Sequence, residues 1–258
     1  MDIEAYLKRD YIINMIEAGS RADGRAFDEM RALEVTKGFV ADKAPGSAMA
    51  RLGDTVVLAG VSMDVGEPYP DSPTSGVMTT STELRPMASP NFELGPPRED
   101  SIELSRVVDR GIRESGAIDV EKLFIEEEKV WMVFIDLHIL DNHGNLLDAA
   151  SLAAVSALLD ARMPKYEDGK VVRGEWAGKL PITCTPISLT FAKVKNKILL
   201  DPTVDEEYAM DARLTIATTD NVNAMQKGGV GKFTLEEVES IVDAAFEKAP
   251  ALRKKVEA

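Results

Sequence analysis

A polar turn between an apolar strand and an alanine-rich helix has the form of an anion site. Residues 130–154 read VWMVFIDLHILDNHGNLLDAASLAA. The first N–H groups of a helix have no partner within it, and the helix dipole favours negative charge there. The turn, Asp141–Leu146, contains no Lys or Arg. The scaffold of a phosphate site is present without its cation, which predicts an enzyme fold that has lost its catalytic equipment.

Three arginines, Arg106, Arg110 and Arg113, could bind phosphate groups. At about 100° per residue they fall within an arc of about 60° on one helix. A row of guanidinium groups suits bidentate binding of phosphate oxygens. The alternative is a solvated face with Asp109 and Glu114 as acidic neighbours, and helix geometry alone leans to that alternative. Apolar residues on the opposite side are expected in the core: Leu104, Val108 and Ile112.

The segment Lys227–Lys232, KGGVGK, is similar in letters to a nucleotide-binding loop. A Walker loop needs a hydroxyl after its lysine to hold Mg²⁺, and Phe233 stands in that place. The hydroxyl comes one residue later at Thr234, which opens the helix-capping pattern TLEE. A glycine-rich connection into the last helix is therefore the preferred interpretation.

Other polar residues give weaker signals. Asp136 and His138 share one face of a strand, but the chain has only 2 histidines, so a hydrogen-bonded His is expected and no metal site is predicted. The acidic run Asp201–Asp211 could bind Mg²⁺, supply a general acid or form a solvated loop. Cys184 lacks an identifiable base, and no Ser/His/Asp triad is present. We therefore assign no catalytic residue and no cofactor.

The composition limits the possible partners. The chain has 258 residues, with 30 Lys+Arg against 44 Asp+Glu and a net charge of −14. Such a chain repels nucleic acid on average, so an RNA contact must be local or be completed by a more basic partner. The single cysteine fits a reducing cytoplasm. We expect no membrane span, because no apolar run approaches roughly 18–20 residues, and no signal peptide in MDIEAYLKRD.

Hydrophobic periodicity predicts an α+β fold from two similar halves. We expect an N-terminal helix within residues 1–20 and one domain over 21–258, with halves at about 21–163 and 164–258. The N-terminal helix (2–18) should bury Ile3, Tyr6, Leu7, Ile13 and Ile16. Predicted strands cover 32–36, 47–51, 55–65, 77–84, 130–140, 187–194, 198–200 and 212–218. Predicted helices cover 98–116, 146–163 (buried all round and stopped by Pro164) and 234 to about 255. The strand 130–140 reads as apolar on nearly both faces.

These residues together resemble the ribonuclease PH family from Arg21 to about Ala249. The resemblance is carried by RADGR at 21–25, SAMARLGDTVVLAGV at 47–61, ELSRVVDRGIRES at 103–115 and the strand–turn–helix segment. It implies the ribonuclease PH-like fold, which is ribosomal protein S5 domain 2-like.

The chain departs from the catalytic members of that family at three places. They carry Gly-Thr-Arg at the turn, where this chain has Gly144-Asn145-Leu146. They carry Gly-Glu-Ala-Asp, where this chain reads Tyr208-Ala-Met-Asp211. They place paired arginines before the long helix, where only Arg98 stands here. The missing groups imply an inactive homologue of phosphorolytic 3′–5′ exoribonucleases.

This combination resembles the non-catalytic ring subunit of the archaeal exosome. That resemblance implies a ring of three heterodimers with a catalytic ribonuclease PH-like partner, and RNA-binding cap proteins. The partner would degrade RNA from its 3′ end with phosphate, while this chain shapes the active site and binds RNA through Arg110, Arg113 and Arg106. The alternatives are an autonomous phosphate-dependent 3′–5′ exoribonuclease, which Leu146 disfavours, and an ATP-dependent partner-binding protein using Lys227–Lys232.

Overall fold

The computed structural model describes residues 3–40 and 43–258, and its first part forms a six-stranded sheet. The strand order is β1-β2-β3-β6-β4, with β5 added beside β6, and only β4 pairs in parallel. The Gly53-Asp54 hairpin joins β2 to β3, as predicted, with Leu52 opposite Thr55. The strands are β1 Leu33–Lys37, β2 Gly46–Leu52, β3 Thr55–Gly66, β4 Val77–Leu84, β5 Phe124–Glu126 and β6 Lys129–Asp141.

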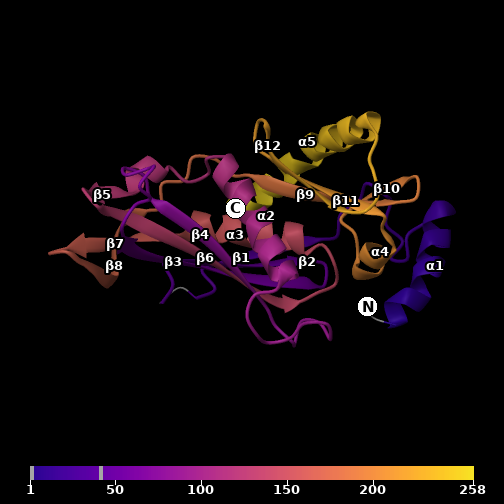
Figure 1. The fold of residues 1–258 in the computed structure, drawn as a ribbon, viewed down its shortest axis with the longest axis horizontal. Helices are drawn as coiled ribbons and strands as arrows, with labels where there is room; N and C mark the ends of the chain where they lie inside the picture. The colour runs from indigo at the N-terminus through magenta and orange to yellow at the C-terminus, as the bar shows by residue number, and fades with distance from the viewer. Residues whose placement is uncertain (1–2, 41–42) are drawn as a thin grey trace.

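The later part of the chain builds a four-stranded antiparallel sheet in the order β10-β9-β11-β12. Its strands are β9 Ile187–Val194, β10 Lys197–Leu200, β11 Ala212–Thr218 and β12 Val222–Gly229. Between the two sheets in sequence comes a hairpin of β7 Arg162–Glu167 and β8 Lys170–Lys179. Figure 1 shows this hairpin at one end of the long axis and α1 at the other.

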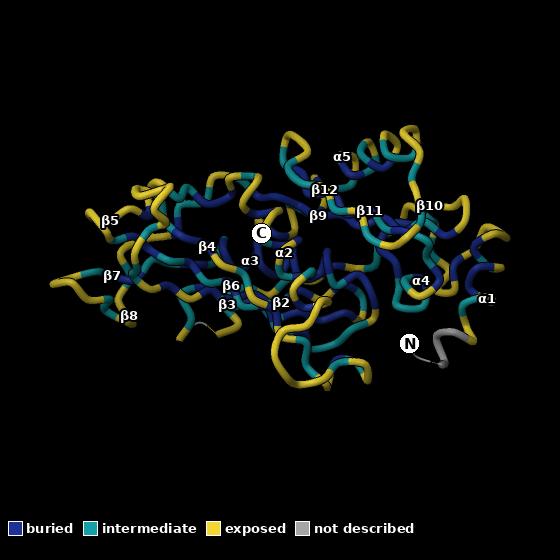
Figure 2. Tube along the Cα trace, in the orientation of Figure 1, coloured by how far each residue is buried: buried dark blue, intermediate teal, exposed yellow. Residues whose placement is uncertain are grey.

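The helices cover and join the sheets. They are α1 Ile3–Glu17, α2 Glu99–Glu114, α3 Leu146–Asp160, α4 Val204–Ala209 and α5 Leu235–Glu257, with a 3₁₀ turn η1 at Val120–Leu123. Helix α3 contacts β2 and β3 of the first sheet and β9 of the second, so it lies between them. Its alanines allow this close approach on several sides: Ala149, Ala150, Ala153, Ala154 and Ala157 are all fully buried (Figure 2).

Several predicted elements changed in the structure. Helix α3 ends at Asp160 rather than 163, and Pro164 lies inside β7, at an irregularity of a two-stranded edge where a missing N–H is tolerated. Strand β6 is buried on one face only, because its alternate residues are half-exposed. The η1 turn, β5, the β7–β8 hairpin, α4 and β12 were not predicted.

Helix α1 confirms the predicted N-terminal helix but not its whole apolar face. Ile13 and Ile16 are buried as expected, while Leu7 is 73% exposed. The side chains of Ile3 and Tyr6 lie outside the described residues. The division of the chain at about residues 163 and 164 stays a prediction. The capping box predicted at Thr234 is present: its side chain accepts from the Glu237 N–H, and the Glu237 side chain accepts from the Thr234 N–H.

Candidate functional site

The turn Asp141–Leu146 connects β6 to α3, and the N–H groups of its residues 142–145 are bonded within the chain. The fold places it against the segment that leads into α4: the Val204 N–H donates to the His143 carbonyl at 3.2 Å. A Cβ on Gly144 would lie 2.4 Å from the nitrogen of Val204, so only glycine fits. Three N–H groups of the turn each donate a hydrogen bond of 3.1 Å. That of Asn142 donates to the Ala88 carbonyl, that of His143 to the Thr55 hydroxyl, and that of Gly144 to the Asn142 side chain.

A carboxyl group of the chain itself takes the next N–H. Asn145 donates its backbone N–H to Oε1 of Glu207 at 2.8 Å. Asn145 is the N-cap of α3 in the left-handed conformation, which Asn tolerates better than most residues. Burial raises the pKa of Glu207 to about 7, against the lowering effects of this N–H and of the Arg213 and Arg31 charges. The position beside the N-terminus of α3 would suit a bound anion, and here the carboxyl group of Glu207 occupies it.

Asn145 also joins two buried aspartates. Its side-chain amide donates to Asp148 at 2.7 Å and to Asp201 at 2.8 Å. Asp148 accepts two further bonds from Thr190, from its N–H at 3.0 Å and its hydroxyl at 2.7 Å. Burial raises the pKa of Asp148 to about 7, although the bonds from Thr190 and Asn145 oppose the shift. These contacts tie the start of α3 to β9 and the strand end after β10.

Arg31 holds the other side of the turn. It binds Asp201 bidentately, at 2.9 Å from Nε and 2.7 Å from Nη2, and donates to the carbonyls of His143 and Gly144. Arg25 adds a third bond to Asp201 at 3.0 Å. Burial would raise the pKa of Asp201, and the bonds and charge of Arg31 outweigh it, so this pKa lies below its usual value. Asp201 is therefore a structural counter-ion.

A second ion pair anchors the N-terminal segment. The side chain of Arg21 is fully buried and binds Glu206 through Nε at 2.8 Å and Nη2 at 2.7 Å. The acidic run Asp201–Asp211 is therefore not a solvated loop, because two of its acids are buried in ion pairs. Whether it supplies a general acid stays a prediction. Asp201 and Glu206 are buried and paired with arginines from residues 21–31. The half-buried Asp211 accepts the Lys195 N–H at 2.8 Å, and Asp205 lies 4.0 Å from Lys8. Among the described residues, no group of acids, histidines or cysteines could hold a metal ion.

A cavity of about 250 Å³ opens beside the turn, between α2 and α4. Leu146 and Leu147 line it from α3, and Glu207 lines it from α4. Arg213 is its one lining Arg or Lys among the described residues, and Nη2 of Arg213 is paired with Glu103 at 2.6 Å. A phosphate would meet aliphatic groups and carboxyl groups here. The remaining lining residues are Leu84, Ser89, Asn91, Phe92, Asp100, Glu103, Leu104, Asn142, Val204, Tyr208 and Met210.

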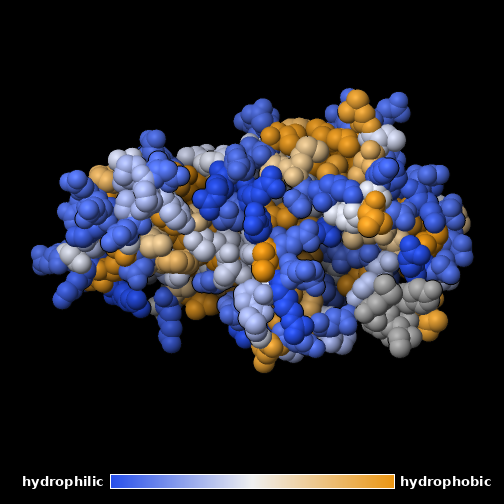
Figure 3. All heavy atoms as spheres, in the orientation of Figure 1, coloured by the Kyte–Doolittle hydropathy of each residue, from blue (hydrophilic) through white to orange (hydrophobic). Residues whose placement is uncertain are grey.

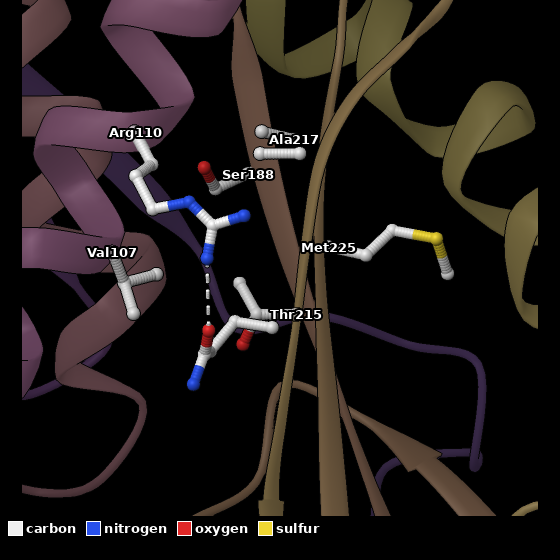
Figure 4. Close-up of a pocket in the computed structure, with 8 residues that line it drawn as sticks. Val107, Arg110, Ser188, Thr215, Ala217 and Met225 are labelled. Carbon is white, nitrogen blue, oxygen red and sulfur yellow. Dashed lines mark hydrogen bonds between the residues drawn. The ribbon is translucent and has the colours of Figure 1, made fainter.

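The structure places the three predicted RNA-binding arginines on the exposed side of α2, and the three apolar residues opposite them in the core, as expected. Arg110 extends from α2 toward β12 and donates to the side chain of Gln226 at 3.3 Å (Figure 4). Arg113 binds Asp109 at 2.9 and 3.0 Å, and this bond raises its pKa. The two acids near Arg106 pair with other arginines: Asp109 binds Arg113, and Glu103 binds Arg213.

The surface around these arginines is polar. Figure 3 shows hydrophilic side chains gathered over the middle of the molecule, where α2 lies, while apolar ones gather over α5. Beside Arg110 is a small pocket formed with Val107 of α2 and with residues of three strands: Ser188, Thr215, Ala217, Ala224, Met225 and Gln226. Whether these arginines bind RNA stays a prediction.

The weaker candidates have structural roles. Asp136 accepts from Ser81 at 2.6 Å, and the half-buried His138 lies 3.3 Å from Arg85 and 3.6 Å from Glu83. The expected hydrogen-bonded histidine is confirmed, although it is not fully buried.

The predicted glycine-rich connection Lys227–Lys232 is partly strand. Its residues Lys227–Gly229 end β12, and Gly229 and Gly231 lie against the backbone of Asp211. Cys184 donates from Sγ to the Ser115 carbonyl at 3.3 Å.

Sequence reasoning missed the arginine–carboxylate network and Glu207. The segment Arg21–Arg25 was noticed as a motif, but nothing in its spacing pointed to partners about 180 residues away. Between Arg21 and Glu206 the separation is 185 residues. Glu207 lay in the acidic run, where its neighbours gave no sign that it faces a helix N-terminus.

Comparisons with known proteins agree with this architecture. Models of the 3′ exoribonuclease family match residues 29–164 (domain 1) and 184–248 (domain 2). The exosome complex component Rrp42 of Thermococcus gammatolerans is 51% identical over 261 residues, covering 98% of this chain and 95% of that protein. Rrp42 of Methanocella arvoryzae is 51% identical over 259 residues, covering 99% of this chain and 98% of that protein.

No helix among the described residues has the length and apolarity to cross a membrane.

Solved structures give the same answer. A chain of the Archaeoglobus fulgidus exosome with RNA bound to the active site matches with a TM-score of 0.91 and 47% identity, covering 98% of this chain and 99% of that chain. Rice Rrp46 shares the fold with a TM-score of 0.71 at 19% identity, covering 92% and 99%. The two sheets, the helix between them and the turn at its start are thus those of a known fold, and the chain belongs to the ribonuclease PH-like 3′ exoribonuclease family.

Proposed function

We propose that the chain is a non-catalytic subunit of an RNA-degrading exosome ring. The observation that carries this proposal is the start of α3, where the N–H of Asn145 is bonded to Glu207 and the adjoining cavity is lined by Leu146. Phosphorolysis requires inorganic phosphate to be held as the attacking group, and a site of carboxyl and aliphatic groups repels it. The similarity to proteins named exosome components supports the same assignment.

The active site of the assembly would belong to a catalytic ribonuclease PH-like partner. In this proposal three heterodimers close a ring, and RNA-binding cap proteins attach to it in the cytoplasm. Rings close when two different interfaces alternate around an axis. This chain shapes the partner's active site and helps to hold RNA, which is cut from the 3′ end by phosphate to release nucleoside diphosphates.

RNA binding is assigned to Arg110, Arg113 and Arg106. Their exposure on α2 leaves guanidinium groups available. Neither Glu103 nor Asp109 pairs with Arg106, and the described partner of Arg110 is the amide of Gln226, so acids constrain these two arginines least. Arg113 must share its charge with Asp109. Arg110 and Arg106 are therefore expected to contribute more to RNA affinity than Arg113.

The test of the assignment is phosphorolysis of a 3′-labelled RNA by the purified chain, alone and with its partner. We expect nucleoside diphosphate release only from the assembled ring, with a mass near that of six subunits in light scattering. The variant Leu146→Arg should stay inactive alone, because one cation does not remove the carboxyl group from the turn. Phosphate-dependent release by the native chain, free of partner, would instead establish the autonomous exoribonuclease.

A second test concerns the arginines in the assembled ring. Arg110→Ala should reduce the slope of log affinity against log salt by roughly 0.7 to one unit and weaken different RNA sequences equally. Arg113→Ala should have a smaller effect because its charge is shared. Arg173→Ala is the matched control, since Arg173 is an exposed arginine on β8, outside the row of three arginines on α2. Unchanged RNA affinity in Arg110→Ala, with the ring intact, would show that the row of arginines on α2 is a solvated face.

A further inference from the structure

We propose that Glu207 is the specificity-determining residue that excludes inorganic phosphate from this subunit, because its carboxyl group occupies the anion position at the start of α3. The inference rests on the proposed non-catalytic function and goes beyond it. Loss of the cationic residue at position 146 explains weak phosphate binding. An internal carboxyl group at the turn weakens phosphate binding further, because it takes the Asn145 N–H that phosphate would use.

The geometry of Glu207 is that of an intramolecular ligand. Its Oε1 accepts the Asn145 N–H at 2.8 Å, which is within the range of a strong hydrogen bond to a charged acceptor. The N–H groups at the start of a helix carry the positive end of its dipole, so a carboxylate is stabilised there as a phosphate would be. The carboxyl group therefore uses the attraction that phosphate would use.

The rest of the fold keeps Glu207 in place. It belongs to α4, whose first turn is fixed by a capping box between Thr203 and Glu206. The same Glu206 is bound by the buried Arg21. The backbone at the start of α4 lies against Gly144, and the N–H of Val204, its first residue, donates to the carbonyl of His143. With α4 fixed at both points, the side chain of Glu207 has a rigid base.

Removal of the carboxyl group would leave an anion site rather than an empty apolar hole. The Asn145 N–H would then face the cavity of about 250 Å³, together with Leu146 and Leu147, the first two residues of α3. Helix geometry gives the N–H groups of these residues no partner inside the helix. The cavity also contains Arg213, whose buried Nε has no hydrogen-bond partner among the described residues. These donors suit a tetrahedral anion.

Another acid in the same cavity separates occupancy from general repulsion. Asp100 lies exposed on the first turn of α2 and lines the cavity, on a different element from the turn. At pH 8, above the pKa of about 7 of Glu207, this residue is mainly a carboxylate. Under that condition Glu207→Gln and Asp100→Asn each remove a carboxylate and preserve shape. Charge repulsion alone predicts a gain in phosphate affinity for both variants. Occupancy predicts a gain at Glu207 only.

The experiment titrates inorganic phosphate into the full native chain and into Glu207→Gln, Glu207→Ala and Asp100→Asn. Binding is followed by calorimetry and by the amide NMR signal of Asn145, and circular dichroism checks folding. We expect Glu207→Ala to bind phosphate roughly tenfold more tightly than the native chain, in line with an anion at a partly buried helix N-terminus. Glu207→Gln should show a smaller gain, and Asp100→Asn should match the native chain.

The outcomes distinguish this inference from the proposed function. If neither Glu207 variant gains phosphate affinity, or Asp100→Asn gains as much, the inference is overturned while the non-catalytic assignment stands. If Glu207→Ala does not fold, Glu207→Gln against Asp100→Asn still decides between the two explanations. Phosphorolysis by the native chain alone would overturn the proposed function, whatever the variants bind.

Discussion

Replacement of Arg21 by alanine should destabilise the chain more than any surface arginine. The Arg21 side chain is fully buried, and so is that of its partner Glu206. Arg21→Ala removes a bidentate pair and two bonds of 2.9 Å to the carbonyls of Leu200 and Asp201. Removing one partner of a buried pair costs about 3–5 kcal/mol, because the other charge is left without compensation. The free energy of unfolding of a domain is only about 5–15 kcal/mol.

Urea denaturation of the purified chain measures this loss. With a denaturant slope of about 3 kcal/mol per molar, the unfolding midpoint should fall by roughly 1–1.7 M. The control is Arg98→Ala, because Arg98 forms an Arg–Glu pair with Glu93 that is largely exposed at 72% and 64%. That change should cost about 0–1 kcal/mol.

A double variant tests the electrostatic cause. Arg21→Met with Glu206→Leu replaces the pair by apolar groups of similar size, and should recover part of the stability lost in Arg21→Ala. Recovery should be incomplete because Glu206 also accepts the Thr203 N–H at 2.8 Å. A loss below about 1 kcal/mol in Arg21→Ala would refute the argument that this pair anchors the N-terminal segment.

Two further changes test the buried start of α3. The folded-state pKa of Asp148 lies at about 7, above its ordinary value of 3.8, so its contribution to stability is present at low pH and lost as pH rises through about 7. Asp148→Asn should flatten the fall in unfolding free energy between pH 5 and 7 by up to about 1.4 kcal/mol per pH unit, and an unchanged slope in urea melts would contradict the raised pKa. Gly144→Ala should lower thermal stability by roughly 1–3 kcal/mol, because its φ of 93° is left-handed and its Cβ would lie 2.4 Å from backbone. Gly116→Ala is the control, because Gly116 also has a left-handed φ of 64° but open space where a Cβ would lie. The extra loss of stability in Gly144→Ala measures the cost of the close backbone contact, and equal losses in the two variants would show that this contact costs nothing.

Local patterns in the sequence determined most of the elements. The apolar run before Asp141 and the alanines after Leu146 predicted β6, the turn and α3, because hydrophobic periodicity acts over a few residues. The same reasoning failed where the tertiary structure overrides the preference of the local sequence. Pro164 reads as a helix stop, yet the helix had already ended at Asp160 and the proline lies in an irregular edge hairpin.

The start of α3 shows the limit most clearly. The sequence by itself determined that the turn lacks a cation and that Leu146 cannot hold phosphate. Only the tertiary structure decided what fills the anion position, because Glu207 lies 62 residues beyond Asn145. The role of Asp201 was equally hidden, since its counter-ion Arg31 is 170 residues away. Charge pairing in a folded core depends on distance in space, which no local pattern of residue types contains.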